Sequence, residues 1–443
     1  MKIRNVIIHF ALIVFPISYS FGQTDSALQK LNFHFQTTYI YQYKPAFHSP
    51  YSGTNSLQGT EEKQNSVTAT LYVGARLWKG SELYINPEIA GGSGLSGAYG
   101  LAASTNAETF RVGNPAPVLY LARAYLMQTF ALGKGKEKSD DQTNGLKGYQ
   151  PKNYLRLFIG KCSLGDLYDN NSYSNSPRIQ FMNWCLVNNG TWDYASNVRG
   201  YTNSLTAILH LNDITCKAGF AAMATIANGP DLSTDFNKFG SINLEIDRSY
   251  KIGNKSGNIG FLGYDNYADM GNYQQAIINA SKSDSSKIPD IISTREYGRH
   301  KFGTGINIGQ QITETIGVFG RAGWSDGNNE TWCYTEADHT ASIGISFNGK
   351  QWKRENDNAG MGVIVNGLSQ YHKLYLEEGG LGFELGDGKL NYGNEYATEL
   401  YYSCKPNVSG IFLTGDYQFI INPGFNKDRG PVNVFSFRLH IEL

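Results

Sequence analysis

Charged and aromatic side chains recur in this sequence on segments where polar and apolar residues alternate, and again within residues 166–200. An arginine can form two parallel hydrogen bonds with one partner, and a carboxylate accepts several. Tryptophan and tyrosine add flat apolar faces, so these groups together could bind a neutral solute that carries many hydroxyl groups. The candidates are Arg76, Glu88, Arg123, Arg156, Arg321 and Arg438 on the alternating segments, and Arg178, Trp184, Trp192, Asp193 and Arg199 within residues 166–200.

The same residues also have a purely structural interpretation. Arginine and glutamate side chains on one polar face can pair only to satisfy each other. Trp184 and Phe181 can form the core that attaches a long loop to the rest of the protein. For Arg123 the alternation is ambiguous, because Leu121, Tyr125 and Met127 would share its face.

Motifs for catalysis or cofactor binding are missing from the sequence. It contains no H-E-x-x-H, G-x-S-x-G, P-loop or dinucleotide-binding pattern. The five cysteines form no C-x-x-C pair, which argues against a zinc module or a disulfide scaffold. Asp265 and Asp269 lack the spacing of a twelve-residue calcium loop. We expect no cofactor, no metal and no enzyme activity, while a disulfide between Cys162 and Cys185 stays open.

The composition restricts the class of protein. The chain has 443 residues, and its 38 basic and 38 acidic side chains give a formal charge of zero. Without a basic run, this balance argues against nucleic acid as a partner. Aromatic residues make up 13% of the chain, with 29 Tyr and 23 Phe, whereas disordered chains are poor in them. We expect an all-β protein, and a barrel of this length can be one domain.

The N-terminus has the three-part layout of a secretory signal peptide. Residues 1–4 are basic, residues 6–17 are mostly apolar, and Ser20 and Gly22 are small residues at the expected cleavage site. We therefore predict a signal peptide over residues 1–22 and a mature domain over residues 23–443. No other window approaches 18 continuous apolar residues, so no spanning helix is expected.

Alternation with a period of two runs through most of the mature chain. It is clearest at the C-terminus, where Phe435, Phe437, Leu439, Ile441 and Leu443 alternate with polar residues. This period places all apolar side chains on one face of a β-strand and the polar ones on the other. Sixteen segments qualify as strands: residues 31–44, 65–77, 81–90, 118–130, 153–161, 201–210, 214–223, 240–249, 257–265, 299–310, 315–323, 338–348, 358–366, 396–404, 408–421 and 432–443.

The connections between these segments alternate in length. The odd-numbered connections are mostly long, and the even-numbered ones are mostly short, apart from a Lys- and Gly-rich stretch at 131–152. Long loops at one end and tight turns at the other are typical of a transmembrane antiparallel up-and-down β-barrel in an outer membrane. The polar faces would then line an aqueous lumen. Aromatic residues expected in the girdles at the membrane interfaces are Tyr39, Tyr41, Tyr43, Trp78, Tyr84, Tyr401 and Tyr402.

Several longer runs of the chain resemble one known family. They include residues 44–57, 78–84, 94–97, 166–170, 177–184, 189–194, 199–201, 321–327, 366–369, 379–387, 416–419 and 428–432. In this order they are similar to the carbohydrate-selective porin (OprB-type) family over nearly the whole mature chain. One departure is the terminal residue, because outer-membrane barrels usually end in an aromatic residue and this chain ends in Leu443.

The resemblance implies a sixteen-stranded outer-membrane channel that passes mono- or small oligosaccharides by diffusion. It also implies a constriction of charged and aromatic side chains, built partly by loops folded inward. The expected partners are carbohydrate solutes and outer-membrane lipid, with a homo-oligomer as an open possibility. Two alternatives are a secreted β-rich glycan-binding protein and an outer-membrane barrel enzyme such as a lipase or protease.

Overall fold

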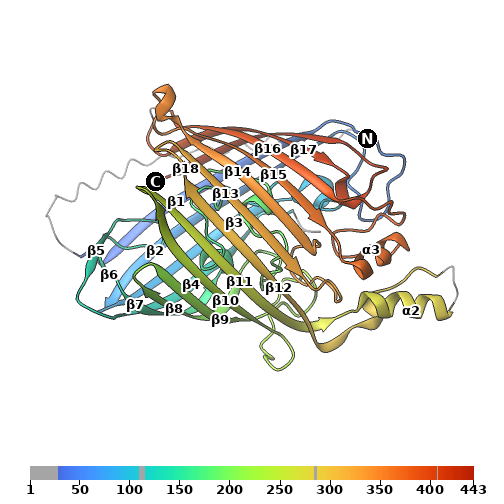
Figure 1. Ribbon diagram of the computed structural model, residues 1–443, viewed down its shortest axis with the longest axis horizontal. Coiled ribbons are helices and arrows are strands. Elements are labelled where there is room, and N and C mark those ends of the chain that lie inside the picture. Colours follow the sequence, from blue (N-terminus) through green and yellow to red (C-terminus); the bar gives the residue numbers. More distant parts are fainter. Residues whose placement is uncertain (1–27, 109–114, 284–286, 407) are drawn as a thin grey trace, which may run out of the picture.

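The computed structural model describes residues 28–108, 115–283, 287–406 and 408–443. The signal peptide predicted over residues 1–22 lies outside these residues. Within them, sixteen strands form one closed antiparallel barrel in which each strand pairs with its neighbours in the chain (Figure 1). The barrel strands are β1 (Leu31–Lys44), β2 (Glu62–Trp78), β3 (Ser81–Gly92), β4 (Val118–Ala131), β7 (Tyr154–Cys162), β8 (Thr202–Leu211), β9 (Ile214–Ala221), β10 (Gly240–Ile252), β11 (Lys255–Met270), β12 (Glu296–Gln311), β13 (Ile316–Ser325), β14 (His339–Asn348), β15 (Asn358–Gly367), β16 (Glu395–Cys404), β17 (Ile411–Ile421) and β18 (Val432–Glu442).

The first and last strands close the barrel. β1 pairs with β18 from Gln36 opposite Glu442 to Tyr43 opposite Phe435. Closure leaves no strand edge with unpaired backbone groups, which a β-structure surrounded by lipid requires. The sixteen predicted segments coincide with these strands. The largest difference is at β11, which has 16 residues and extends past the end predicted at residue 265. A spanning strand needs only about 9–11 residues, so β11 is longer than the membrane requires.

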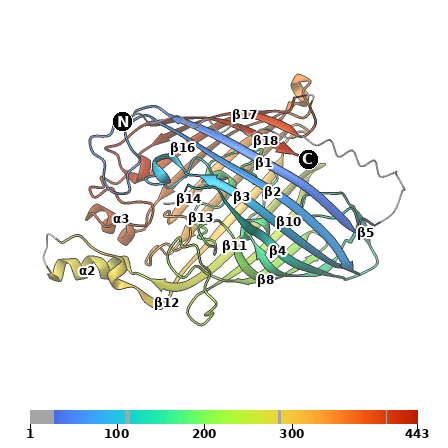
Figure 2. The ribbon, with the colours of Figure 1, turned by 180° about the vertical axis from the view of Figure 1, so that it is seen from behind.

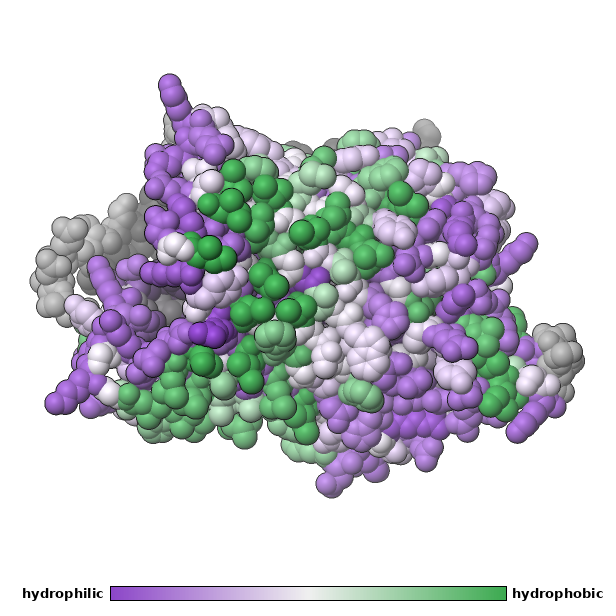
Figure 3. All heavy atoms as spheres, in the orientation of Figure 1, coloured by the Kyte–Doolittle hydropathy of each residue, from purple (hydrophilic) through white to green (hydrophobic). Residues whose placement is uncertain are grey.

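The two faces of the strands differ as the alternation predicts. On β2, Leu71 is 41% exposed on the outer surface, whereas Thr70 and Tyr72 point inward and are 0% and 5% exposed. Figure 3 shows hydrophobic residues gathered over the strands on the side of the barrel, with hydrophilic residues at both ends. An apolar outer wall is what a surrounding hydrocarbon layer stabilises.

Two residues expected in the aromatic girdles lie elsewhere. Tyr84 on β3 and Tyr401 on β16 are 0% and 4% exposed, because both occupy inward positions of their strands. Trp78 and Tyr402 do lie on the outer surface, at 57% and 41% exposed. The prediction for Tyr84 and Tyr401 was therefore wrong, and both residues belong to the filled interior of the barrel.

The connections segregate to the two ends. The helices α2 (Tyr273–Ser283) and α3 (Gln370–Glu377) lie at the end with the long connections, where their residues Tyr273 and Tyr375 pack together (Figures 1 and 2). The opposite end carries short connections and one exception, residues 132–153. This stretch contains a separate hairpin of β5 (Lys136–Ser139) and β6 (Gly148–Pro151). The remaining helical segments are α1 (Trp184–Val187), η1 (Leu95–Gly97), η2 (Leu164–Asp166), η3 (Ile292–Thr294), η4 (Gly349–Trp352) and η5 (Pro423–Phe425).

Two further observations concern the whole described chain. No helix among the described residues is long and apolar enough to cross a membrane. All five cysteines are free thiols, so Cys162 and Cys185 do not form a disulfide.

Candidate functional site

The connection between β7 and β8, residues 163–201, folds into the lumen. It contacts inward-facing side chains of β10, β12, β13, β16 and β18. On β16, the Glu399 carboxylate accepts hydrogen bonds from the backbone amides of Met182 (2.5 Å) and Asn183 (2.8 Å). The connection, which we call the inner loop, is a packed insertion, in line with the inward-folded loops that the resemblance implied.

Two of the predicted arginines hold the inner loop against the wall. Arg321 on β13 donates from Nε to Oδ2 of Asp169 (2.9 Å) and from Nη1 to the Leu186 carbonyl (2.6 Å). Arg438 on β18 donates to the Pro177 carbonyl (2.7 Å). Both arginine side chains are 0% exposed. Because solvent does not reach them, their role in this geometry is to position the loop.

Trp184, Trp192 and Asp193 form part of the packed core of the inner loop. Trp192 is 1% exposed and donates from Nε1 to Asn243 on β10 (3.0 Å). Trp184, 6% exposed, packs in the same aromatic cluster. Asp193 is fully buried and accepts hydrogen bonds from the backbone amides of residues 332–334 at 2.8–2.9 Å. Asp193 and Trp184 therefore join the inner loop to the connection between β13 and β14, and Trp192 joins it to β10.

Arg178, on the inner loop, binds the carboxylates of Glu88 and Glu108. We call these three side chains the Arg178 group. Its Nε donates to Glu108 Oε1 (2.8 Å), and its Nη2 donates to Glu88 Oε2 on β3 (3.1 Å). The side chain keeps 15% of its surface exposed, whereas Glu88 and Glu108 keep 3% and 6%. Nη1 donates to three neutral oxygens on the wall, those of Gln36, Thr70 and Tyr72.

The charges at this group are unequal, with one arginine beside two carboxylates. Burial raises the pKa of Glu108, against the opposing effect of Arg178. Burial acts against the charge of Arg178, but Glu108 is the chief neighbour that raises its pKa well above the ordinary value. Arg178 thus stays charged, and Glu108 takes up a proton at a higher pH than an exposed glutamate does.

Two more arginines lie beside tyrosine rings, Arg123 on β4 and Arg199 on the inner loop. Arg123 on β4 forms a bidentate pair with Asp166, both N–O distances being 2.7 Å. Its guanidinium lies 5.3 Å from the ring centre of Tyr201, and that of Arg199 lies 4.5 Å from the ring centre of Tyr120. Both arginines are partly exposed. Cation–π contacts of this kind hold a guanidinium in place without neutralising it.

A β-bulge places Arg123 in the lumen. On β3, Asn86 pairs with Arg123 and Pro87 pairs with Leu121, so Ala122 has no partner in this register. Proline cannot donate to the ladder, which favours a bulge beside it. The extra residue shifts the alternation: Leu121 is 42% exposed on the outer surface, whereas Arg123, Tyr125 and Met127 all face inward. The ambiguity seen in the sequence was the signature of this bulge.

Arg76 and Arg156 lie nearer the end with the short connections. Arg76 on β2 donates to Glu82 (2.9 Å), and Arg156 on β7 donates to Thr129 (3.0 Å). Glu82 and Glu88 are six residues apart on β3, so roughly 20 Å along the strand separates Glu82 from the partner of Arg178. The structure therefore brings Glu88, Arg123, Arg178 and Arg199 together and sets Arg76 and Arg156 apart.

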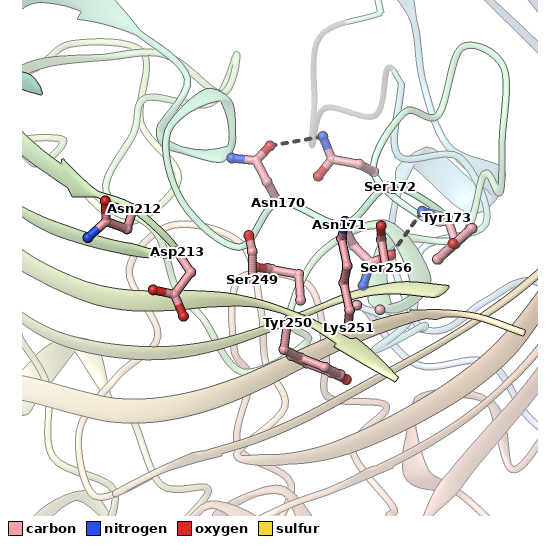
Figure 4. A pocket seen from close by; sticks show the side chains of 14 residues that line it. Asn170, Asn171, Ser172, Tyr173, Asn212, Asp213, Ser249, Tyr250, Lys251 and Ser256 are labelled. Atoms are coloured by element: carbon pink, nitrogen blue, oxygen red, sulfur yellow. Dashed lines mark hydrogen bonds between the residues drawn. The ribbon is translucent and has the colours of Figure 1, made fainter. Parts of the chain in front are cut away.

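A cavity of about 860 Å³ opens between the inner loop and the wall from β8 to β12, at the end with the short connections (Figure 4). Most of its lining is neutral and polar. Figure 4 shows Asn170 of the inner loop apart from Ser249 of the wall, and both line the cavity together with Asn171 and Ser256. Lys251 and Asp213 are the charged residues of the lining. Carboxamides both donate and accept hydrogen bonds, as sugar hydroxyls do.

Sequence reasoning did not identify several partners of the arginines. Glu108 and Asp166 lie in connections, where alternation assigns no direction. Tyr72 lies on the inward face of β2 but was not included among the candidates. Tyr120 precedes the bulge on β4, so its inward direction depends on the same shift that hid that of Arg123. The Asn-rich run at 170–175 was a visible signal for the cavity.

The described residues can be compared with the side-chain groupings of a metal site and of a catalytic triad. They contain no group of three or more His, Cys, Asp and Glu side chains that could hold a metal ion. Ser369, His372 and Asp338 do lie together, and His372 Nδ1 is 2.9 Å from the Asp338 carboxylate. However, Ser369 Oγ donates to the Gly327 carbonyl and accepts from the His372 backbone amide (3.3 Å). Ser369 is thus the N-cap of α3.

Comparisons with known proteins give a consistent result. The family model described as carbohydrate-selective porin, OprB family, matches residues 54–443. Among solved structures, the chain is similar to the high-pH structure of Pseudomonas putida OprB, with 16% identity, 94% of each chain covered and a TM-score of 0.69. The low-pH structure of that protein has 12% identity, a coverage of 94% of this chain and 93% of that one, and a TM-score of 0.48.

The outer membrane channel DcaP of Acinetobacter baumannii has 9% identity to the chain. The match covers 93% of this chain and 97% of that one, with a TM-score of 0.50. A search among curated proteins gave no match. At these identities the structural likeness shows the fold alone.

Proposed function

Because the chain belongs to the carbohydrate-selective porin, OprB family, and is an outer-membrane channel for carbohydrates, we propose that sugars diffuse along the wall formed by β2, β3, β4 and β7. The predicted residues that face the lumen and keep part of their surface exposed lie on or against this wall. They are Arg76, Arg123, Arg156, Arg178 and Arg199, together with the more buried Glu88.

The observation that carries this proposal is the Arg178 group. One side chain of the inner loop binds Glu88 on the wall and Glu108 of the connection between β3 and β4. It thereby joins the inner loop to the wall at this level. A sugar that passes here meets charged donors and acceptors that are already oriented by each other, so it can exchange hydroxyl hydrogen bonds with them at little cost in ordering.

Tyrosine rings supply the apolar part of the path. Tyr120 and Tyr201 both donate to Glu88, at 2.5 Å and 2.9 Å, and each supports an arginine on its ring. The remaining predicted residues, Trp184, Trp192, Asp193, Arg321 and Arg438, act on transport by holding the inner loop in place.

Export follows from the predicted leader. We propose that residues 1–22 are removed by a signal peptidase after translocation, which leaves the mature domain beginning at Gln23. Mass spectrometry of the protein isolated from outer membranes tests this cleavage, because an intact N-terminus would contradict it.

Liposome swelling with neutral sugars and with salts of similar size tests the transport function. The expected result is fast swelling with mono- and small oligosaccharides that slows as the sugar grows. Arg123→Ala should change the sugar rates, because it removes a lumenal pair. Lys63→Ala, which removes the same charge from an exposed pair with Glu61, is the matched control. If wild-type vesicles swell with no sugar, sugar transport by this protein is refuted.

A further inference from the structure

The hairpin of β5 and β6 departs from the other connections on the periplasmic side. It joins β4 to β7 through residues 132–153, whereas the other periplasmic connections are two to nine residues long. A tight turn would suffice to join two neighbouring strands. The additional residues are held by contacts with the inward face of β1.

The tip of the hairpin binds the inward face of β1. The Asp141 carboxylate accepts a hydrogen bond from Asn32 Nδ2 (3.0 Å) and lies 3.1 Å from His34 Nε2. Asn32 Nδ2 also donates to the carbonyls of Gln142 (2.9 Å) and Gly145 (3.1 Å). Asn32 is 3% exposed and His34 occupies the next inward position on β1. The tip therefore lies inside the rim of the barrel.

The second arm of the hairpin lies over the wall between β4, where the hairpin begins, and β1, where its tip binds. Leu146 is 2% exposed, which shows that it packs into the interior. A Cβ atom added to Gly148 would lie 3.2 Å from Arg76 Nη1 on β2. Since the hairpin starts between β4 and β7 and reaches β1, it crosses the periplasmic ends of β3 and β2. It covers the side of the mouth that lies directly beneath the wall carrying Glu88 and Arg123.

The next sector of the mouth is open. The cavity of about 860 Å³ begins at the turn between β8 and β9 and extends to β12. A smaller cavity of about 240 Å³ continues past it toward β15 and shares Ser172 and Tyr173 of the inner loop. The first volume lies within the range of pockets that hold small organic ligands.

We propose that the hairpin closes the β1–β4 sector of the periplasmic mouth and directs each sugar out through the amide-lined cavity beside it. The side chains of Asn170, Asn258, Ser249 and Ser256 take the hydroxyl groups of a neutral sugar, so the cavity is an exit binding site distinct from the Arg178 group. This inference rests on the proposed transport of sugars.

The hairpin is tested by removing it. In one variant, residues 132–153 are replaced by the Lys-Gly sequence that joins β2 to β3. In a second variant, Asn32→Ala removes the amide that holds the tip and leaves the chain length unchanged. Conductance in a planar bilayer should rise at least about twofold in the first variant, and larger oligosaccharides should enter vesicles. Asn32→Ala should shift both measurements in the same direction by a smaller amount.

The cavity is tested by blocking it. Asn258, on the lumenal face of β11 beside the cavity, is changed to cysteine in a background in which Cys216→Ser and Cys404→Ser remove the accessible thiols. A bulky charged thiol reagent should reduce the conductance of the intact channel by more than half. The reduction should be smaller when the hairpin is absent, because a second exit is then open. Lys350→Cys, at an exposed turn on the same side of the membrane, is the control that should not respond.

The outcomes separate this inference from the transport function. If the wild-type protein passes no sugar, the transport function fails. If it passes sugars but removing the hairpin changes neither conductance nor size limit, the hairpin only fastens the N-terminal strand. If the modified Asn258→Cys channel conducts as before, the exit lies elsewhere. Heat-modifiable migration on gels shows that each variant is a folded barrel.

Discussion

Replacing Arg178 by alanine tests the central role given to this residue. Arg178 carries the positive charge that faces Glu88 and Glu108, with side chains 15%, 3% and 6% exposed. Its removal leaves two buried carboxylates without this cation, and breaking a buried pair in this way costs about 3–5 kcal/mol. The measurements are made at a pH above the raised pKa of Glu108, so that both carboxylates stay ionised.

The expected effect on ion flow follows from the charge count. The group changes from one net negative charge to two. A monovalent ion passing roughly 8 Å from one additional charge in water changes in energy by about 0.5 kcal/mol. This corresponds to about a 2.4-fold change for each ion sign, or about sixfold in the cation-to-anion permeability ratio at low salt. At 0.1 M salt, screening over roughly 10 Å lowers the change in this ratio to about twofold.

The assay is the reversal potential in a planar bilayer under a salt gradient, at low and at moderate ionic strength. Arg178→Ala should shift the potential toward cation selectivity, and the shift should shrink as salt is added. Sugar-induced swelling of vesicles should change in the same variant. Lys63→Ala supplies the control, because its exposed pair with Glu61 lies outside the group and outside the cavity. An unchanged reversal potential at low salt would falsify the assignment of Arg178 to the conducting path.

A double variant tests whether the shift in ion selectivity comes from the change in charge. Arg178→Ala combined with Glu108→Gln restores the original net charge of the group, so most of the selectivity shift should disappear. If the double variant is as cation-selective as Arg178→Ala alone, the effect comes from displacement of the inner loop and not from charge.

Three further predictions follow from the same contacts. Arg321→Ala should lower the free energy of unfolding by about 3–5 kcal/mol, because it leaves the buried carboxylate of Asp169 without its cation. The temperature of the heat-modifiability transition on gels measures this loss, and an unchanged transition would contradict the anchoring role. As the pH falls through the raised pKa of Glu108, loss of its negative charge should increase anion permeability. Glu108→Gln should remove that pH response of the reversal potential, whereas a response that persists would place the titrating group elsewhere. Deleting Ala122, the extra residue of the bulge, should leave Arg123 opposite Asn86 and still facing the lumen, so yield and conductance should be retained; loss of assembly would contradict the bulge assignment.

Alternation was sufficient for most of the fold. A period of two assigns each strand residue a direction without reference to its neighbours, which is why Thr70 and Leu71 could be placed on opposite faces from the sequence. It does not report how deep an inward residue lies. Tyr84 and Tyr401 were expected in the girdles because tyrosine is common there, yet their strand positions direct both into the lumen.

For the candidate site too, alternation predicted the direction of a side chain but not its surroundings. The strand arginines were found because a charge on the lipid-facing side of a strand is costly. Their separation into Arg123 beside the path and Arg321 beneath the inner loop could not be predicted, because it depends on where residues 163–201 fold after they leave the wall. Likewise, no local pattern brings Asp141 of the hairpin to Asn32 on β1.

The sequence by itself determined the number of strands, the direction of most side chains and the family, since these depend on local period and on ordered runs of residues. Tertiary structure alone decided which charges meet. Arg178, Glu88 and Glu108 come from two connections and a strand that are far apart in the chain, and only the packing of the inner loop against the closed wall sets the distances between them.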